Sequence, residues 1–254
     1  MNSKKIGLVL SGGGARGIAH AGVLKAFDEL GIPISIISGT SSGAMVGALY
    51  AAGVKPDQMV GIMQKTKLFN IGGLSFNMKG LLKTSSFKKI VVENLKVKNF
   101  EELNIPVIVC LTDFTNATTL YVSKGQLLDP LIASCSIPLI FTPTIMNGSV
   151  MVDGGLLNNF PVEPLIGNCD FIVGVHVNPI GALKKAKIKG ILERCFQMAI
   201  MSTTKTKSGH CDLFLEPVAL RKYSVFDTGH ANEIFSIGYK AAMNSKDVLL
   251  KLVQ

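Results

Sequence analysis

The residue of this sequence best placed to do chemistry is a serine inside a Gly-x-Ser-x-Gly pentapeptide. The pentapeptide is Gly39-Thr40-Ser41-Ser42-Gly43, between an apolar run at 34–37 and a small-residue helix expected over 44–52. At such a turn the flanking glycines relieve crowding, and the helix dipole favours negative charge developing on the serine. We therefore predict that Ser41 is a nucleophile and that Ser42 caps the helix that follows.

A glycine-rich loop at 11–17, Ser-Gly-Gly-Gly-Ala-Arg-Gly, precedes this serine, between a strand expected at 6–10 and a helix expected over 18–30. Consecutive glycines let backbone N–H groups converge, and a helix N-terminus adds positive potential. Gly12, Gly13 and Gly14 are therefore candidate donors of an oxyanion hole. Arg16 could orient the loop or attract an anionic substrate, and it could equally be an ordinary ion-pair partner.

The same loop also fits the dinucleotide-binding fingerprint, as Gly12-x-Gly14-x-x-Gly17. That fingerprint requires an acidic residue about 20 positions further on, at the end of the second strand. The second strand here ends in Ile-Ile-Ser-Gly at 36–39, without a carboxylate. An NAD-type function is disfavoured for this reason.

The serine needs a base, and Asp153 is the best candidate. It ends an apolar run and is followed by two glycines, which allow another backbone or a ligand to approach closely. A free aspartate, with a pKa of about 3.9, is a weak base, but burial beside the serine would raise that pKa. A simple Asp-Gly turn is the alternative. His20 and His176 are expected to be structural, and neither His210 nor His230 lies in a recognisable triad motif.

Taken together, the three motifs resemble those of bacterial patatin-like phospholipases, over about residues 5–177. The glycine loop, the pentapeptide and the Asp153-Gly154-Gly155 box follow in that family's order, and the stretches 134–143 and 158–161 are also similar to it. The resemblance implies a three-layer α/β/α sandwich with a mostly parallel central sheet. It also implies a Ser41–Asp153 dyad without a catalytic histidine, hydrolysing lipid acyl esters with no cofactor and no metal.

Alternating strand and helix patterns predict one α/β domain over residues 1–254. A loop at 68–82 contains apolar residues that could form a lid or simply pack on the core. The expected strands are 6–10, 34–37, 107–112, 118–122, 142–145, 150–152, 171–177 and 213–215. The expected helices are 18–30, 44–52, one opening at 55–57, 85–95, 129–136, 187–205 and 232–252.

Composition restricts the partners. The formal net charge is +9, and lysines gather at 79–98, at 184–189 and at 205 and 207. Such runs are usually solvated surfaces; an anionic lipid surface is the sharper interpretation. With no Trp and no aromatic-interleaved basic stripe, nucleic acid is not expected. No apolar run reaches the roughly 18 residues that span a bilayer, and five scattered cysteines indicate reduced thiols. A cytoplasmic protein, peripheral to a membrane at most, is therefore expected.

The sequence is also compatible with two other functions. A soluble carboxylesterase or thioesterase would share the serine chemistry and never meet a membrane. A catalytically silent relative would bind lipid as a regulatory protein without forming an acyl-enzyme. The sequence predicts neither the oligomeric state nor the preferred head group or acyl chain.

Overall fold

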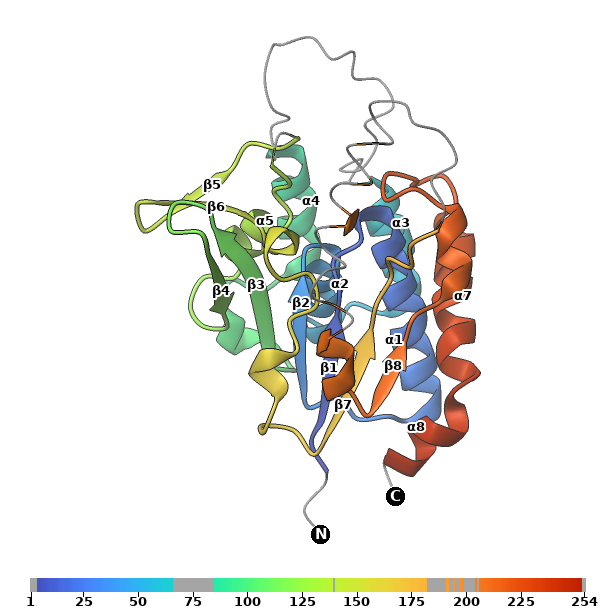
Figure 1. Ribbon diagram of the computed structural model, residues 1–254. Helices are drawn as coiled ribbons and strands as arrows, with labels where there is room; N and C mark the ends of the chain where they lie inside the picture. Colours follow the sequence, from blue (N-terminus) through green and yellow to red (C-terminus); the bar gives the residue numbers. More distant parts are fainter. Residues whose placement is uncertain are drawn as a thin grey trace.

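The computed structural model describes residues 4–65, 85–138, 140–181, 191, 194, 197, 198, 204 and 206–252. Within these residues the chain forms an eight-stranded sheet flanked by helices (Figure 1). Its order is β5-β6-β3-β2-β1-β7-β8, and β4 pairs with β3. The strands are β1 (Ile6–Leu10), β2 (Ile36–Thr40), β3 (Val107–Asp113), β4 (Thr118–Val122), β5 (Thr144–Met146), β6 (Ser149–Asp153), β7 (Phe171–Val175) and β8 (Leu213–Leu215).

The expected helices that fall within the described residues are also present. They are α1 (Ile18–Leu30), α2 (Ser42–Ala51), α3 (Pro56–Lys65), α4 (Ser85–Leu95), α5 (Leu128–Ser134), α7 (Ala231–Met243) and α8 (Lys246–Leu252). In Figure 1, α1 and α7 run side by side along the sheet. Most of the helix expected over 187–205, and the whole 68–82 loop, lie outside the described residues.

The strands β3, β2, β1, β7 and β8 are parallel, and the central strands β2, β1 and β7 are almost entirely buried. Along β1, Leu8 and Leu10 enter the large core with the helices, whereas Val9 packs on the other face with Phe160 and Val162. Double burial explains why β1 is a continuous apolar run rather than an alternating one.

The last part of the chain differs from the single helix expected over 232–252. α7 ends at Met243 and α8 begins at Lys246. Between them the Ser245 N–H donates to Ala242 O at 2.9 Å, a tighter i→i−3 bond than the α-helical pattern. Asn244 and Ser245 are poor helix formers because their side chains compete for backbone hydrogen bonds, which is a local reason for the break.

Two strands pair with one edge of β3 and bring the site residues together. β2 pairs with this edge up to the pair Thr40 and Cys110, and β6 pairs with it from the pair Asp153 and Leu111 onward. β4 occupies the opposite edge of β3 over the same residues, so β2 and β6 must share one edge, end to end. The chain therefore leaves the sheet after Thr40 where Asp153 arrives.

The hairpin that delivers β6 turns at Asn147 and Gly148, between the strands expected at 142–145 and 150–152. Asn147 has φ 50° and Gly148 has φ 81°, the two left-handed positions of a type I′ turn. β5 and β6 pair antiparallel through Thr144 and Met151 on either side of it. The turn chemistry thus fixes the register that carries Asp153 to β3.

Candidate active site

Ser41 occupies a strained turn between β2 and α2. Its φ is 53° and its ψ is −123°, a left-handed conformation that costs energy for a residue with a side chain. Gly43 is required nearby, because a Cβ there would collide with the carbonyl oxygens of Leu10 and Ser11. Ser41 is only 4% exposed. This is the geometry of the predicted strand-to-helix elbow. The prediction that Ser42 caps the helix is wrong, because Ser41 is the N-cap residue and Ser42 is the first residue of α2.

Asp153 is the buried carboxylate at the same end of the sheet. It is 1% exposed, and its Oδ1 accepts a hydrogen bond from the Gly155 N–H at 2.7 Å. Burial raises the pKa of Asp153 to about 7, against the opposing effects of the Ser41 side chain and the Gly155 N–H, which both favour the charged form. A carboxylate with this pKa is a competent base near neutral pH.

A buried thiol lies next to both residues. Cys135 interacts with the Ser41 side chain and with the charge of Asp153, and it is 3% exposed. Burial raises the pKa of Cys135 well above its ordinary value, and the neighbouring carboxylate adds to this rise. The thiol is therefore neutral, which leaves Ser41 as the candidate nucleophile of the two.

The glycine loop lies against the Ser41 turn and is held from outside. Gly12 O accepts hydrogen bonds from the side-chain amides of Asn159, at 3.2 Å, and of Asn178. The Gly12 N–H donates to Asn159 O at 3.2 Å. Among the described residues, the N–H groups of Gly13 and Gly14 have no hydrogen-bond partner. Of the three predicted oxyanion donors, Gly13 and Gly14 therefore stay candidates, whereas the Gly12 N–H is already bonded to Asn159 O.

Arg16 is buried inside the protein and fastens this loop. Its Nε and Nη2 donate to Tyr223 O at 2.8 and 2.6 Å. The Ala15 N–H donates to Val225 O at 2.8 Å, and Gly14, with φ 58°, leaves no room between its Cα and that carbonyl for a Cβ. Of the roles open to Arg16, these contacts favour orienting the loop.

The buried histidines belong to the scaffold. His20 Nε2 bonds to Ser11 O at 2.8 Å, and burial lowers the pKa of His20 to about 4, so the ring is neutral. His176 Nδ1 bonds to Glu216 Oε1 at 2.8 Å. Neither bond involves Ser41 or Asp153. His210 and His230 are exposed.

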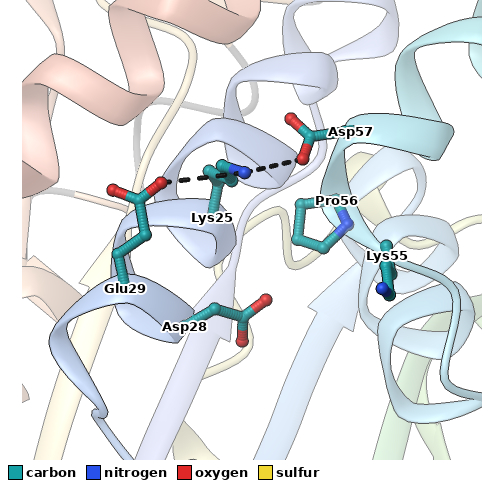
Figure 2. A pocket seen from close by; sticks show the side chains of 6 residues that line it. All are labelled: Lys25, Asp28, Glu29, Lys55, Pro56 and Asp57. Carbon is teal, nitrogen blue, oxygen red and sulfur yellow. Dashed lines mark hydrogen bonds and ion pairs between the residues drawn. The ribbon is translucent and has the colours of Figure 1, made fainter.

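A surface hollow elsewhere on the protein has a different character. It measures about 300 Å³ and is lined by Lys25, Asp28, Glu29, Lys55, Pro56 and Asp57 (Figure 2). Lys25 lies between Asp57, at 2.7 Å, and Glu29, at 3.7 Å, so charges within the hollow pair with one another. It contains none of the predicted site residues. In the part of the chain that the structure describes, no group of three or more His, Cys, Asp or Glu side chains could hold a metal ion.

Sequence reasoning missed several residues that build the site. Ser134, Asn159 and Asn178 hold the Ser41 turn and the glycine loop through buried hydrogen bonds. The first two lie in stretches already noted as similar to the family, so a signal existed without an assigned role. For Asn178 no local pattern was available, because its partner Gly12 is 166 residues away.

Comparison with known families decides the classification. A family model described as patatin-like phospholipase matches residues 8–166, more than half of the chain. The chain belongs to the patatin-like phospholipase family. The predicted resemblance is therefore confirmed.

Curated relatives support the same family assignment. An uncharacterized NTE family protein of Mycobacterium tuberculosis is 32% identical over 182 residues, covering 70% of this chain and 50% of the relative. A lysophospholipase nte1 of Aspergillus fumigatus is 34% identical over 185 residues, covering 70% of this chain and 12% of the relative. The chain thus spans half or less of the length of these patatin-like relatives.

Solved structures confirm the predicted fold class. VipD from Legionella pneumophila superimposes with a TM-score of 0.57 at 15% identity, covering 98% of this chain and 67% of that one. Human GIVD cytosolic phospholipase A2 gives 0.55 at 11% identity, covering 99% and 59%. The fold is the expected α/β sandwich, with a mostly parallel central sheet flanked by helices. Among the described residues, none of the helices combines the length and apolar character needed to cross a membrane.

Proposed function

We propose that this patatin-like chain is a serine lipid acyl hydrolase that cleaves carboxylic ester bonds of phospholipids or lysophospholipids. Ser41 is the nucleophile, Asp153 the general base and acid, and the glycine loop supplies the oxyanion hole. Membership of the family and the lysophospholipase names of several relatives support the reaction class. The residue roles rest on the geometry of the site.

The observation that carries the proposal is the pairing of a strained serine with a carboxylate whose burial raises its pKa to about 7. An ordinary surface aspartate would be too weak a base for a serine hydroxyl. Burial also excludes the water that would otherwise compete for the Ser41 proton. Both features would be costly to keep in a protein that only binds lipid, which favours catalysis.

In the proposed reaction, Asp153 accepts the Ser41 proton as Oγ attacks the ester carbonyl carbon. The carbonyl oxygen becomes an oxyanion near the free N–H groups of Gly13 and Gly14, beside the N-terminus of α2. The tetrahedral intermediate collapses, the carbon–oxygen bond to the alcohol breaks, and Asp153 returns its proton to the leaving alcohol. Asp153 then takes a proton from water as the water oxygen attacks the acyl-serine carbonyl carbon. When the bond from that carbon to Oγ breaks, Asp153 returns the proton to Oγ, which releases the fatty acid and restores Ser41 and the Asp153 carboxylate.

The proposed place of action is the surface of an anionic membrane. The formal net charge of +9 would attract such a surface, and charge attraction of this kind weakens as salt is added. Activity on vesicles containing phosphatidylglycerol that exceeds activity on a dispersed short-chain ester would support this placement. Equal activity on both would favour a soluble esterase.

The decisive experiment is labelling with a fluorescent fluorophosphonate, followed by mass spectrometry of the labelled peptide. Wild type, Ser41→Ala and Asp153→Asn are compared at equal concentrations of folded protein. We expect labelling of wild type on Ser41 alone, none in Ser41→Ala, and slower labelling in Asp153→Asn. A folded wild-type protein that takes no label but still binds lipid vesicles would replace the hydrolase by a lipid-binding function.

A further inference from the structure

Ser134, at the end of α5, contacts the backbone of the proposed nucleophile. Its Oγ accepts a hydrogen bond from the Ser41 N–H at 2.8 Å and donates one to Cys110 O at 2.6 Å. A hydroxyl has one proton and two lone pairs, so this pattern fixes the direction of both bonds. Ser134 is fully buried, so both bonds are shielded from water.

The two partners of Ser134 are the groups that would otherwise bond to each other. In the parallel pairing of β2 with β3, the Ile37 N–H donates to Pro106 O at 2.9 Å. Two ladder steps further on, the same register would bring the Ser41 N–H to Cys110 O. The Ser134 hydroxyl is inserted at that step. It satisfies both groups while allowing Ser41 to turn out of the sheet.

This insertion bears on the strain at Ser41. A buried N–H in a left-handed turn persists only where its surroundings hold it, since the unbonded group and the backbone conformation are both costly. Without the hydroxyl, the Ser41 N–H would be left unpaired or would relax towards Cys110. Either change would shift Oγ relative to Asp153, which is itself held by Ser136 O through its own N–H at 3.0 Å.

We infer that Ser134 is a positioning residue for the Ser41 nucleophile, and that its hydroxyl replaces a sheet hydrogen bond to hold the strained turn. The inference rests on the proposed function of Ser41. It assigns Ser134 no contact with substrate, so its effect falls on the rate of the chemical step rather than on substrate binding.

The chain offers a matched control in Ser38. Its hydroxyl is also fully buried and also donates to a backbone carbonyl, Pro161 O, at 2.6 Å, but it makes no bond to Ser41. Ser134→Ala and Ser38→Ala therefore remove the same atom from similar surroundings. Only the first removes the partner of the nucleophile's N–H.

The test measures fluorophosphonate labelling rates and steady-state kinetics of wild type, Ser134→Ala and Ser38→Ala, each corrected for its folded fraction. We expect Ser134→Ala to lower the labelling rate and kcat by about 10- to 100-fold, the scale of small misplacements of reacting groups, with KM changed by less than about threefold. Ser38→Ala should label at nearly the wild-type rate. The apparent pKa of activity should stay near its wild-type value, because Asp153 is untouched.

If Ser134→Ala does not fold, Ser134→Cys is measured in its place, since a thiol of similar size is a weak donor and acceptor. A folded Ser134 variant that labels at the wild-type rate would overturn the inference, as would an equal loss in Ser38→Ala. If wild type itself takes no label on Ser41, the proposed function fails instead, so the two failures are distinguishable.

Discussion

Thr40 and Asp153 occupy consecutive positions along one edge of β3, opposite Cys110 and Leu111. Ser41 directly follows Thr40, so strand pairing alone brings the serine and the carboxylate together. Groups placed by a sheet are held more rigidly than groups placed by flexible loops. The candidate dyad is thus a property of the topology, with β2 and β6 meeting end to end.

The pH dependence of activity follows from the pKa of about 7 that burial gives Asp153. The base must be unprotonated, so kcat/KM should be low in acid, rise about tenfold per pH unit below 7 and level off above it. The measurement is kcat/KM for a short-chain ester between pH 5 and 9. The variants His210→Gln and His230→Gln, at exposed positions, should give the same profile. A profile that shifts in either variant would point to a histidine base.

Much of this site was predictable because its parts are local. Three motifs indicate their own backbone conformation within a few residues: the glycine loop, the Ser41 pentapeptide and the Asn147-Gly148 turn. The pairing of β6 with the same edge of β3 as β2 is different. It depends on contacts between segments far apart in the sequence, and no pattern within β6 says which strand it joins or in which direction.

The supporting residues escaped prediction for the same reason. Ser134 and Asn159 act through backbone groups 93 and 147 residues away, so their family-like surroundings did not show which group each side chain would bind. The prediction of one helix over 232–252 was wrong at 244–245. The helical spacing of apolar residues continues across this point, but two polar residues break the helix there. Periodicity identifies a helical face but does not fix where a helix stops.

Asp153→Asn should make the protein more stable at alkaline pH while removing activity. A carboxyl whose pKa is raised on folding, from 3.8 to about 7, binds its proton more tightly in the folded state. The contribution of Asp153 to the free energy of unfolding therefore falls as pH rises from about 4 to 7 and stays low above 7. Tm measured from pH 5 to 9 should decline more in wild type than in Asp153→Asn. If Tm declined equally with pH in both proteins, ionisation of the buried Asp153 would not destabilise the fold.

Arg16→Lys should impair catalysis although it keeps the charge. The guanidinium donates to Tyr223 O from two nitrogens, and an ammonium cannot reproduce that fork. The glycine loop would lose one of the contacts that hold it in place, and its N–H donors would be misaligned. We expect kcat to fall about 10-fold or more, since complete removal of one oxyanion-hole donor costs about 100-fold or more. The kinetics are compared with Arg221→Lys, which replaces an exposed arginine two residues before Tyr223. Equal, small effects in both variants would mean that charge alone matters at position 16.

Gly14→Ala should abolish most of the activity. Gly31→Ala is the control for the effect of placing an alanine at a left-handed glycine position away from the site. Both glycines have left-handed φ, 58° and 66°, so both substitutions strain the backbone by about 1 kcal/mol or slightly more. Around Gly31 there is open space, whereas a Cβ at Gly14 would collide with Val225 O and displace the glycine loop.

We therefore expect Gly31→Ala to lower Tm by a few degrees with wild-type kcat, because the helix end it caps lies outside the site. Gly14→Ala should lower kcat by about 100-fold or more, since the Gly14 N–H is one of the two proposed oxyanion donors. Both variants are measured for Tm and for turnover of the same ester. Wild-type kcat in a folded Gly14→Ala protein would remove this loop from the oxyanion hole, because a displaced donor could not stabilise the intermediate.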